Sequence, residues 1–456
     1  MIARARGGGL LAPSALGAAL IIGLVAAINP LIAVGAALGV VFAFVVFADL
    51  ALGFAMIAFL SFLEVLPTSG GLSLSKGAGL LLAVAWLARL STRQRERDFF
   101  AEYPVLTWLM VAFLAWASLT LLWATQTGTG VTAISRYFLD MLLLPIAFTA
   151  VRTRRDLVIV LAAIVIGAFV AAAFGIVKPP SPEVIEGRAT GTIGDPNELA
   201  AALIVGLALA AGLLLSRGRS LAVRLGGLAV IPFCAAGVFL SLSRGGLIAL
   251  GALLLAGPFL AGRWRPAMAC LLLVVAASGF LYFTQIASLP ARERVTASNG
   301  GSGRTDLWTV GLRMVDAHPV GGVGVGNFPV ASANYVLQPG LLERSELIFS
   351  TAPKVTHNTY LQVLAEMGFP GLFLFLGIIG ISLICAFRAA RLWSRHGAVG
   401  MEALARGVLL GLIGLLVADF FISEMYGKLL WTMLAIGPAM LAVARQEVAD
   451  RSPAGD

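Results

Sequence analysis

The chain is built from long apolar blocks separated by short polar stretches. Apolar runs of roughly 16 to 25 residues recur along its whole length, close to the ~20 that a helix needs to cross a bilayer. The runs are continuous and do not alternate apolar with polar positions, which excludes a transmembrane β-barrel. The pattern therefore predicts an all-α polytopic membrane protein.

We distinguish fourteen such runs, at residues 14–29, 31–47, 50–66, 76–90, 105–123, 134–151, 157–177, 196–215, 224–240, 246–262, 266–285, 360–387, 404–422 and 428–444. The first two are short, because sixteen residues reach only ~24 Å of a ~30 Å hydrocarbon core. We therefore expect about 12 transmembrane helices plus an extra short N-terminal hairpin around Asn29 and Pro30, up to 14 in all.

Charge fixes the expected orientation. The chain has 32 basic and 23 acidic residues, a net charge of +9, and only 12% of its residues are charged. The excess could suggest a nucleic-acid partner, but the arginines gather at every second connection, which is the positive-inside pattern. The clusters are Arg89, Arg93, Arg95 and Arg97; Arg152, Arg154 and Arg155; Arg217, Arg219 and Arg224; Arg263 and Arg265; and Arg388, Arg391, Arg395 and Arg406. We expect both termini in the cytoplasm, the long polar interval on the outer face, and no nucleic-acid partner.

One polar interval is much longer than the other connections. Between Gln285 and Tyr360 the chain is rich in glycine, arginine and histidine, and connections of this length are usually functional or disordered. We expect three parts: an N-terminal transmembrane bundle at 1–285, a long periplasmic loop acting as a catalytic lid, with a glycine-turn hinge, at 286–359, and C-terminal transmembrane helices with a short cytoplasmic tail at 360–456.

Several common kinds of site are absent from the sequence. Cys234, Cys270 and Cys385 lie in apolar runs without ligand spacing, so we expect no metal and no disulfide. The glycines from Gly322 to Gly326 lack the order and the preceding strand of a dinucleotide site, and no phosphate loop occurs. Arg136 and Asp140, four residues apart on one helix, should neutralise each other. We expect no cofactor and no coupling to ATP or ions.

The first candidate site is Arg188 in the segment that leads into the run at 196–215. Asp195 is a predicted helix N-cap and Pro196 a predicted first helical residue, with Glu198 in the first turn. Capping explains Asp195 but not Arg188. A solvated loop arginine is the alternative interpretation.

The second candidate is Arg244, between Ser243 and the pair Gly245–Gly246, in a tight corner between two runs. An arginine at a helix end can snorkel to the interface. The predicted outer face disfavours arginine, however, and the glycines leave room for a ligand or another backbone. An ionisable residue near membrane depth favours function.

The third candidate is His357, where the long interval re-enters the membrane. A lone histidine is more often a capping or packing residue, but a neutral imidazole can also accept a proton from a hydroxyl. We interpret His318 as structural, and His396 lies among the cytoplasmic arginines.

Arginines and one histidine at the outer boundary suit a particular chemistry. Guanidinium groups bind phosphate oxygens with two parallel hydrogen bonds. A lipid-linked diphosphate must sit at this depth, and charge that develops on it as it leaves can be stabilised there. The residues therefore favour glycosyl transfer from a polyprenyl diphosphate.

The same residues resemble the O-antigen ligase and polymerase superfamily of bacterial inner-membrane glycosyltransferases. The likeness runs from about Gly187 to Gly371. Its pieces are Arg188 with the following Gly-Thr-Ile-Gly-Asp-Pro-Asn-Glu-Leu-Ala, Ser-Leu-Ser-Arg-Gly-Gly at Arg244, Gly303 to Trp308, His318 to Phe328, and His357 to Gly371.

The resemblance implies a metal-independent, inverting transfer of a glycan from undecaprenyl diphosphate to an acceptor hydroxyl on the periplasmic face. It implies diphosphate contacts for Arg188 and Arg244, and a base or acceptor-positioning role for His357. We add Arg304, Asn358 and Tyr360 as substrate-binding residues. The extra N-terminal apolar pair departs from the roughly twelve spans of the ligases.

The sequence leaves the acceptor open. Ligases use a sugar of lipid A–core, whereas O-antigen or exopolysaccharide polymerases use a lipid-linked repeat, and overall motif resemblance favours a ligase. A lipid-linked glycan transporter would show charges buried in mid-span and internal repeats. The candidates lie at one face, which favours an enzyme. A purely structural scaffold leaves Arg244 unexplained.

Overall fold

The computed structural model describes residues 29–64, 74–92, 97–178, 187–216, 220–296, 303–336 and 354–451, together with residues 23, 26, 27 and 338. The first predicted apolar run, 14–29, lies almost wholly outside these residues. The same holds for most of the predicted outer connection at 67–75.

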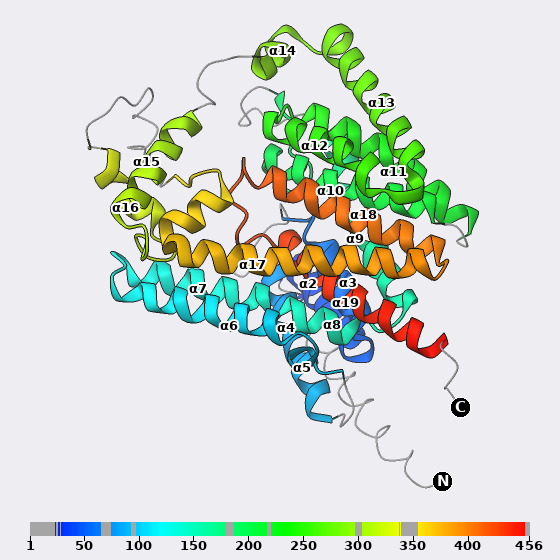
Figure 1. Cartoon of the computed structure of the whole chain (residues 1–456), viewed down its shortest axis with the longest axis horizontal. Helices are drawn as coiled ribbons and strands as arrows, with labels where there is room; N and C mark the ends of the chain where they lie inside the picture. The colour runs from blue at the N-terminus through cyan, green and yellow to red at the C-terminus, as the bar shows by residue number, and fades with distance from the viewer. Residues whose placement is uncertain are drawn as a thin grey trace.

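Within the described residues the secondary structure is entirely helical (Figure 1). The α-helices are α2 (Pro30–Ala48), α3 (Leu50–Leu60), α4 (Leu74–Thr92), α5 (Phe99–Glu102), α6 (Pro104–Leu119), α7 (Thr127–Met141), α8 (Leu143–Ala150), α9 (Arg154–Val177), α10 (Pro196–Leu215), α11 (Leu221–Leu240), α12 (Arg244–Leu260), α13 (Arg265–Leu281), α14 (Leu289–Thr296), α15 (Arg304–Ala317), α16 (Phe328–Val336), α17 (Thr359–Arg395), α18 (Val399–Ala418) and α19 (Lys428–Arg451).

In the described part of the chain, 9 helices are long and apolar enough to cross a membrane. Four shorter apolar helices, at Gly39–Ala48, Leu50–Leu60, Gly77–Ser91 and Arg244–Leu260, complete the set. Together they occupy the thirteen predicted runs that follow the first. The predicted all-α polytopic membrane fold is confirmed, and the exact number of crossings stays a prediction.

Helix α10 forms the centre of the bundle and packs against α9, α11, α12 and α18. Small residues permit this close packing. A Cβ on Gly212 would lie 3.1 Å from the Ala403 carbonyl oxygen, and one on Gly407 would lie 2.9 Å from the Ala208 carbonyl oxygen. Figure 1 shows α10 and α18 running side by side. The N-terminus of α10 and the C-terminus of α18 are therefore held in a fixed relation.

Helix α17 crosses the molecule against α6, α18 and α19. It bends at Gly368, whose φ of 66° is left-handed, two residues before Pro370. The indole Nε1 of Trp116 on α6 donates to the Met367 carbonyl just before the bend, at 2.8 Å. The short first segment of α17 can therefore take a direction of its own at the end of the bundle.

The long polar interval is not an extended loop, because it contains α14, α15 and α16. Leu307, Val310 and Met314 of α15 are buried in a small separate core with Phe328 of α16 and Ala365 of α17. In Figure 1, α15 and α16 lie at one end of α6, α7 and α17. We call this the site end of the bundle, and it also carries the first residues of α10 and α12.

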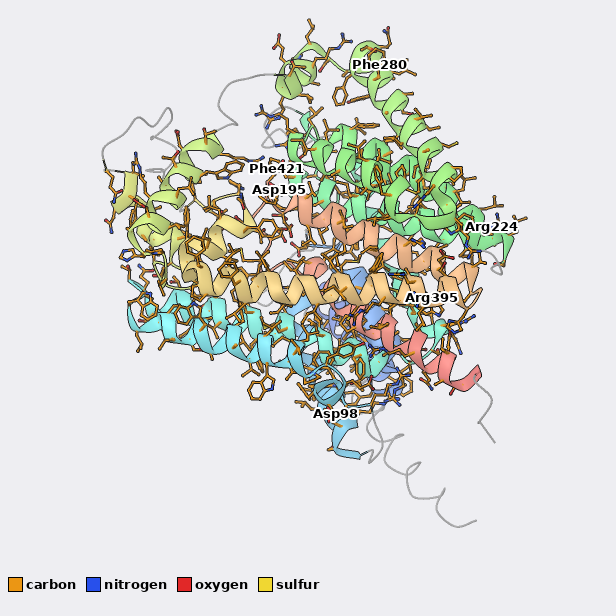
Figure 2. The ribbon with its side chains drawn as sticks, viewed as in Figure 1. Asp98, Asp195, Arg224, Phe280, Arg395 and Phe421 are labelled. Carbon is orange, nitrogen blue, oxygen red and sulfur yellow. The ribbon has the colours of Figure 1, made fainter. Side chains whose placement is uncertain are left out.

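Two of the predicted cytoplasmic arginines mark the opposite end. Figure 2 shows Arg224 and Arg395 there, away from Asp195. Ion pairs form among these residues, for example from Arg406 to Glu402, with Nη2 and Oε1 2.8 Å apart. These arginines lie where the predicted orientation places the cytoplasm, and the orientation itself stays a prediction.

Candidate active site

Arg188 joins two corners that are far apart in the sequence. Its Nε donates to the Ser241 carbonyl at 2.8 Å, in the turn between α11 and α12. The adjacent Ala189 N–H donates to the Leu240 carbonyl at 3.0 Å. These two bonds hold the partly buried guanidinium beside the start of α12.

Asn197 connects the same two corners from α10. Its Oδ1 accepts from Arg188 Nη2 at 3.0 Å and from Ser243 Oγ at 2.8 Å. Ser243 in turn caps α12 by accepting from the Gly246 N–H at 3.1 Å. The predicted N-cap at Asp195 is confirmed, since its carboxylate accepts from the N–H groups of Asn197 and Glu198 at 2.7 and 3.1 Å. The arginine and both helix starts therefore form one bonded unit.

Arg244 is the first residue of α12. The glycines that follow it admit other parts of the protein. A Cβ on Gly245 would lie 2.4 Å from the Phe421 side chain, and one on Gly246 would lie 2.5 Å from the Ala200 Cβ. Asp195 and Phe421 lie near one another in Figure 2. The glycine pair thus brings α10 and the α18–α19 connection against the start of α12.

Arg304, the first residue of α15, completes a cluster of arginines. Gly303 before it has a φ of 82° and no side chain with which to cap the helix. Burial, then the charge of Arg188, lowers the pKa of Arg304, with Arg244 and Arg294 contributing in the same direction and Asp195 opposing. The positive charges of Arg188 and Arg244 therefore lie close enough to affect Arg304.

His357 lies at the edge of this cluster, one residue before the N-cap of α17. Burial, and next the charge of Arg304, lowers the pKa of His357 below its ordinary value of 6.5. Asp195 opposes this shift, and Lys354 adds to it. The imidazole is therefore neutral at pH 7 and able to accept a proton.

The backbone at His357 has a φ of 50°, unusual for a residue with a side chain. Its neighbours are bonded on both sides. The Thr359 N–H donates to the Asp419 carbonyl at 2.9 Å, and the Thr359 Oγ1 donates to the Ile422 carbonyl at 2.8 Å. Trp308 Nε1 of α15 donates to the Thr356 carbonyl at 3.1 Å. Helix α15 and the α18–α19 connection together hold His357 in place.

Two predicted substrate-binding residues have their polar groups engaged within the protein. Asn358 caps α17 by accepting from the Leu361 N–H at 3.0 Å. The Tyr360 hydroxyl donates to the Leu416 carbonyl of α18 at 2.7 Å. Both contacts position the segment that carries His357, and a direct contact with substrate stays a prediction for both.

The acidic residues of the α18–α19 connection were not predicted from the sequence to have a role in the site. Neither carboxylate oxygen of the buried Asp419 has a hydrogen-bond partner within the described residues, and burial raises the pKa of Asp419. Glu424 donates its backbone N–H to Thr359 Oγ1 at 2.8 Å, and burial, then the nearby Glu198, raises its pKa. Asp419 falls inside the apolar run at 404–422, and a lone acid in such a run was the available signal.

The glycine turn at 322–326 is tightly packed. Gly322, Gly324 and Gly326 all have positive φ, and a Cβ on Gly322 would lie 2.3 Å from the backbone of Glu366. The buried Glu366 carboxylate accepts from the Gly326 N–H at 2.7 Å and from the Phe328 N–H at 3.3 Å. These contacts favour a fixed turn, whereas a hinge was expected; the lid at 286–359 stays a prediction.

Four helices therefore begin around the cluster: α10 at Asp195, α12 at Arg244, α15 at Arg304 and α17 after His357. Helix N-termini carry partial positive charge and unpaired N–H groups, and they bind anions. Among the described residues, no group of three or more His, Cys, Asp or Glu side chains could hold a metal ion. The arrangement suits an anion with several oxygens, next to a neutral base.

Comparison with known protein families finds a match over part of the chain. Residues 228–376 match the model of the O-antigen ligase family. The matched segment contains Arg244, Arg304 and His357, whereas Arg188 precedes it. The match confirms the resemblance to the O-antigen ligase and polymerase superfamily. No curated protein matches the chain.

The superfamily supports an O-antigen ligase or polymerase type of function, with lipid-linked glycans as the general class of substrate. With its apolar helices, the chain is a multi-pass membrane protein.

Proposed function

We propose that this protein is an O-antigen ligase-type glycosyltransferase. It moves a glycan from undecaprenyl diphosphate to a hydroxyl of a lipid A–core sugar, at the periplasmic face of the inner membrane. The observation that carries the proposal is the convergence of Arg188, Arg244 and Arg304 beside a neutral His357. The position of Arg224 and Arg395 toward the opposite end supports the orientation.

The arginines and the helix N-termini bind the diphosphate. Arg188 is held by neutral acceptors, the Ser241 carbonyl and the Asn197 amide, so its charge is not cancelled by those bonds. Mutual repulsion among the three guanidinium groups falls when a diphosphate lies between them. Fixed donors of this kind stabilise charge that develops on a leaving group, because they need no reorganisation during the reaction.

His357 takes the proton of the acceptor hydroxyl. The hydroxyl oxygen then bonds to the anomeric carbon of the donor sugar, while the bond from that carbon to the diphosphate oxygen breaks. The electron pair of the broken bond leaves on undecaprenyl diphosphate, whose charge the arginines stabilise. Attack from the side opposite the leaving group inverts the configuration at the anomeric carbon. The step requires a base and cationic donors, both of which the residues supply without a metal ion.

Arg244 provides the direct test. With purified protein, lipid-linked glycan and acceptor, Arg244→Ala should lower kcat by about 10²- to 10³-fold, the usual cost of one such donor. Arg244→Lys should keep only part of the rate, because lysine offers a point charge without the planar fork. Arg395→Ala, which removes an exposed arginine at the opposite end, is the matched control and should transfer normally. Full activity in Arg244→Ala would remove this residue from the mechanism.

The acceptor is decided in cells. A deletion strain of a ligase accumulates unligated lipid-linked polymer, which is the expected result. Single repeats attached to lipid A–core would instead identify a polymerase, which uses a second lipid-linked repeat as its acceptor.

A further inference from the structure

A cleft lies at the site end of the bundle, away from the arginine cluster. It has a volume of about 440 Å³ and is formed by the end of α6, the turn after α15 and helix α16. This volume is within the ~300–1,000 Å³ range of small-molecule sites. The side chains that matter here are Trp123, His318, Asn334 and Tyr335.

The walls of the cleft combine aromatic rings with polar groups. Trp123 is 42% exposed and is held in place by its Nε1, which donates to the Gly321 carbonyl at 3.2 Å. The rings of His318 and Tyr335 meet edge to face at 6.4 Å. Within the described residues, no hydrogen bond uses the Asn334 amide or the Tyr335 hydroxyl. Aromatic rings and polar groups that can still form hydrogen bonds therefore line the same cleft.

This chemistry matches carbohydrate better than phosphate. A pyranose ring has an apolar C–H face that packs on an aromatic ring, and a rim of hydroxyls that hydrogen-bond to amides and phenols. Among the described residues that line the cleft there is neither arginine nor lysine, in contrast to the cluster around Arg304. The ligand class that fits is a neutral, hydroxyl-rich oligosaccharide.

The cleft lies at a fixed distance from the reacting groups. Arg304 begins α15 and His318 follows its last residue, so at 1.5 Å per residue the two ends are about 21 Å apart. Arg313 of α15 donates through Nη1 to the Tyr335 carbonyl at 2.8 Å, which ties α16 to the same helix. A glycan that reaches both places must be several sugars long.

We propose that this cleft is a distal glycan-binding site that holds a chain several sugars away from the reacting anomeric carbon. This inference rests on the proposed function, because only an enzyme that transfers glycans would bring a glycan chain to both the arginine cluster and the cleft. The chain belongs to either the donor or the acceptor. Both offer the same hydroxyl-rich surface, and transfer assays distinguish them.

Binding is tested without the reaction. The probe is lipid-free polysaccharide released by mild acid from the surface glycolipid of the host strain, titrated into purified protein. Asn334→Ala and Tyr335→Ala should each raise Kd by roughly 3- to 10-fold, as expected for one hydrogen bond or one aromatic contact. Gln285→Ala and Phe280→Ala are matched controls on exposed residues elsewhere and should leave Kd unchanged. Equal affinity in all five proteins would overturn the proposal.

Transfer assays identify which substrate occupies the cleft. Each variant is assayed with a long donor and a short acceptor, and then with a short donor and a long acceptor. Asn334→Ala and Tyr335→Ala should raise KM by roughly 3- to 10-fold for one of the long substrates, with kcat unchanged. The assay in which KM rises shows whether the donor or the acceptor occupies the cleft. An unchanged KM in both assays would contradict the proposal. The proposed function fails separately, if Arg244→Ala transfers glycan normally, and the binding titration still decides the cleft.

Discussion

The two ends of the bundle use arginine in opposite ways. At the end away from the site, Arg263 and Arg406 flank the buried Glu402, with N–O distances of 2.9 and 2.8 Å. Arg154 Nη2 likewise donates to Glu447 Oε2 at 2.7 Å. Each of these arginines is paired with a carboxylate of the protein itself, and Arg263 and Arg406 share one.

At the site end the balance is different. Arg188 donates to a carbonyl and an amide, and the charges that act on Arg304 are mainly those of other arginines, with Asp195 as the opposing carboxylate. Positive potential is therefore left for a ligand to satisfy. In this comparison the charge of the partners, not the number of arginines, distinguishes a structural cluster from the cluster that we propose binds substrate.

The largest effect on the rate is expected at His357, because we propose no base at the opposite end of the bundle. His357→Ala should lower kcat by about 10²- to 10⁴-fold, the usual contribution of a general base. His396→Ala is the matched control, because His396 is exposed and follows α17 at the opposite end. Initial rates with purified protein provide the measurement. Equal rates for the two variants would show that His357 takes no part in proton transfer.

Removing one arginine from each end of the bundle tests the comparison between the two ends. Arg304→Ala should lower kcat by about 10²- to 10³-fold with little change in Tm, because it removes a donor from the ligand. Arg406→Ala should destabilise the fold by about 3 kcal/mol and lower Tm, because it weakens a buried ion pair. Rates corrected for folded protein should remain normal in Arg406→Ala. A lower kcat in Arg406→Ala together with a lower Tm in Arg304→Ala would contradict the comparison, because it would place the catalytic arginine at the opposite end.

The pH dependence of transfer gives the smallest and most specific effect. Burial and Arg304 lower the pKa of His357, so its neutral form persists below pH 6.5. The rate should therefore be full at pH 7 and fall on the acidic side with a midpoint below 6.5. In Arg304→Ala one cause of the lowering is gone, and the midpoint of the residual rate should rise. A wild-type midpoint above 6.5 contradicts this placement of His357.

Much of this arrangement follows from the sequence. Hydropathy places the helices, because each of the thirteen runs after the first contains helix, and the cap at Asp195 follows from its position before Pro196. Arg188, Arg244 and His357 were candidates because a polar residue at the end of an apolar run needs a reason. Their roles in transfer remain predictions.

Other features depend on tertiary contacts that the sequence does not show. Asn358 and Tyr360 look available for substrate, but their partners, Leu361 and the Leu416 carbonyl, engage them within the protein. The contact of Thr359 with Asp419 joins residues sixty positions apart. Arg136 was expected to neutralise Asp140, and the two charges do interact, but the charge of Lys428 acts more strongly on Asp140. The Arg136 guanidinium lies 5.6 Å from the centre of the Tyr426 ring. No spacing rule identifies such long-range partners.

The bond from Thr359 to Asp419 has a consequence for biogenesis. Helices enter the membrane in the order of synthesis, so His357 is delivered before α18 and α19 exist. Its backbone cannot be fixed by the α18–α19 connection until both of those helices have been inserted. If His357 is the base that we propose, a nascent chain becomes active only after α18 and α19 have been inserted.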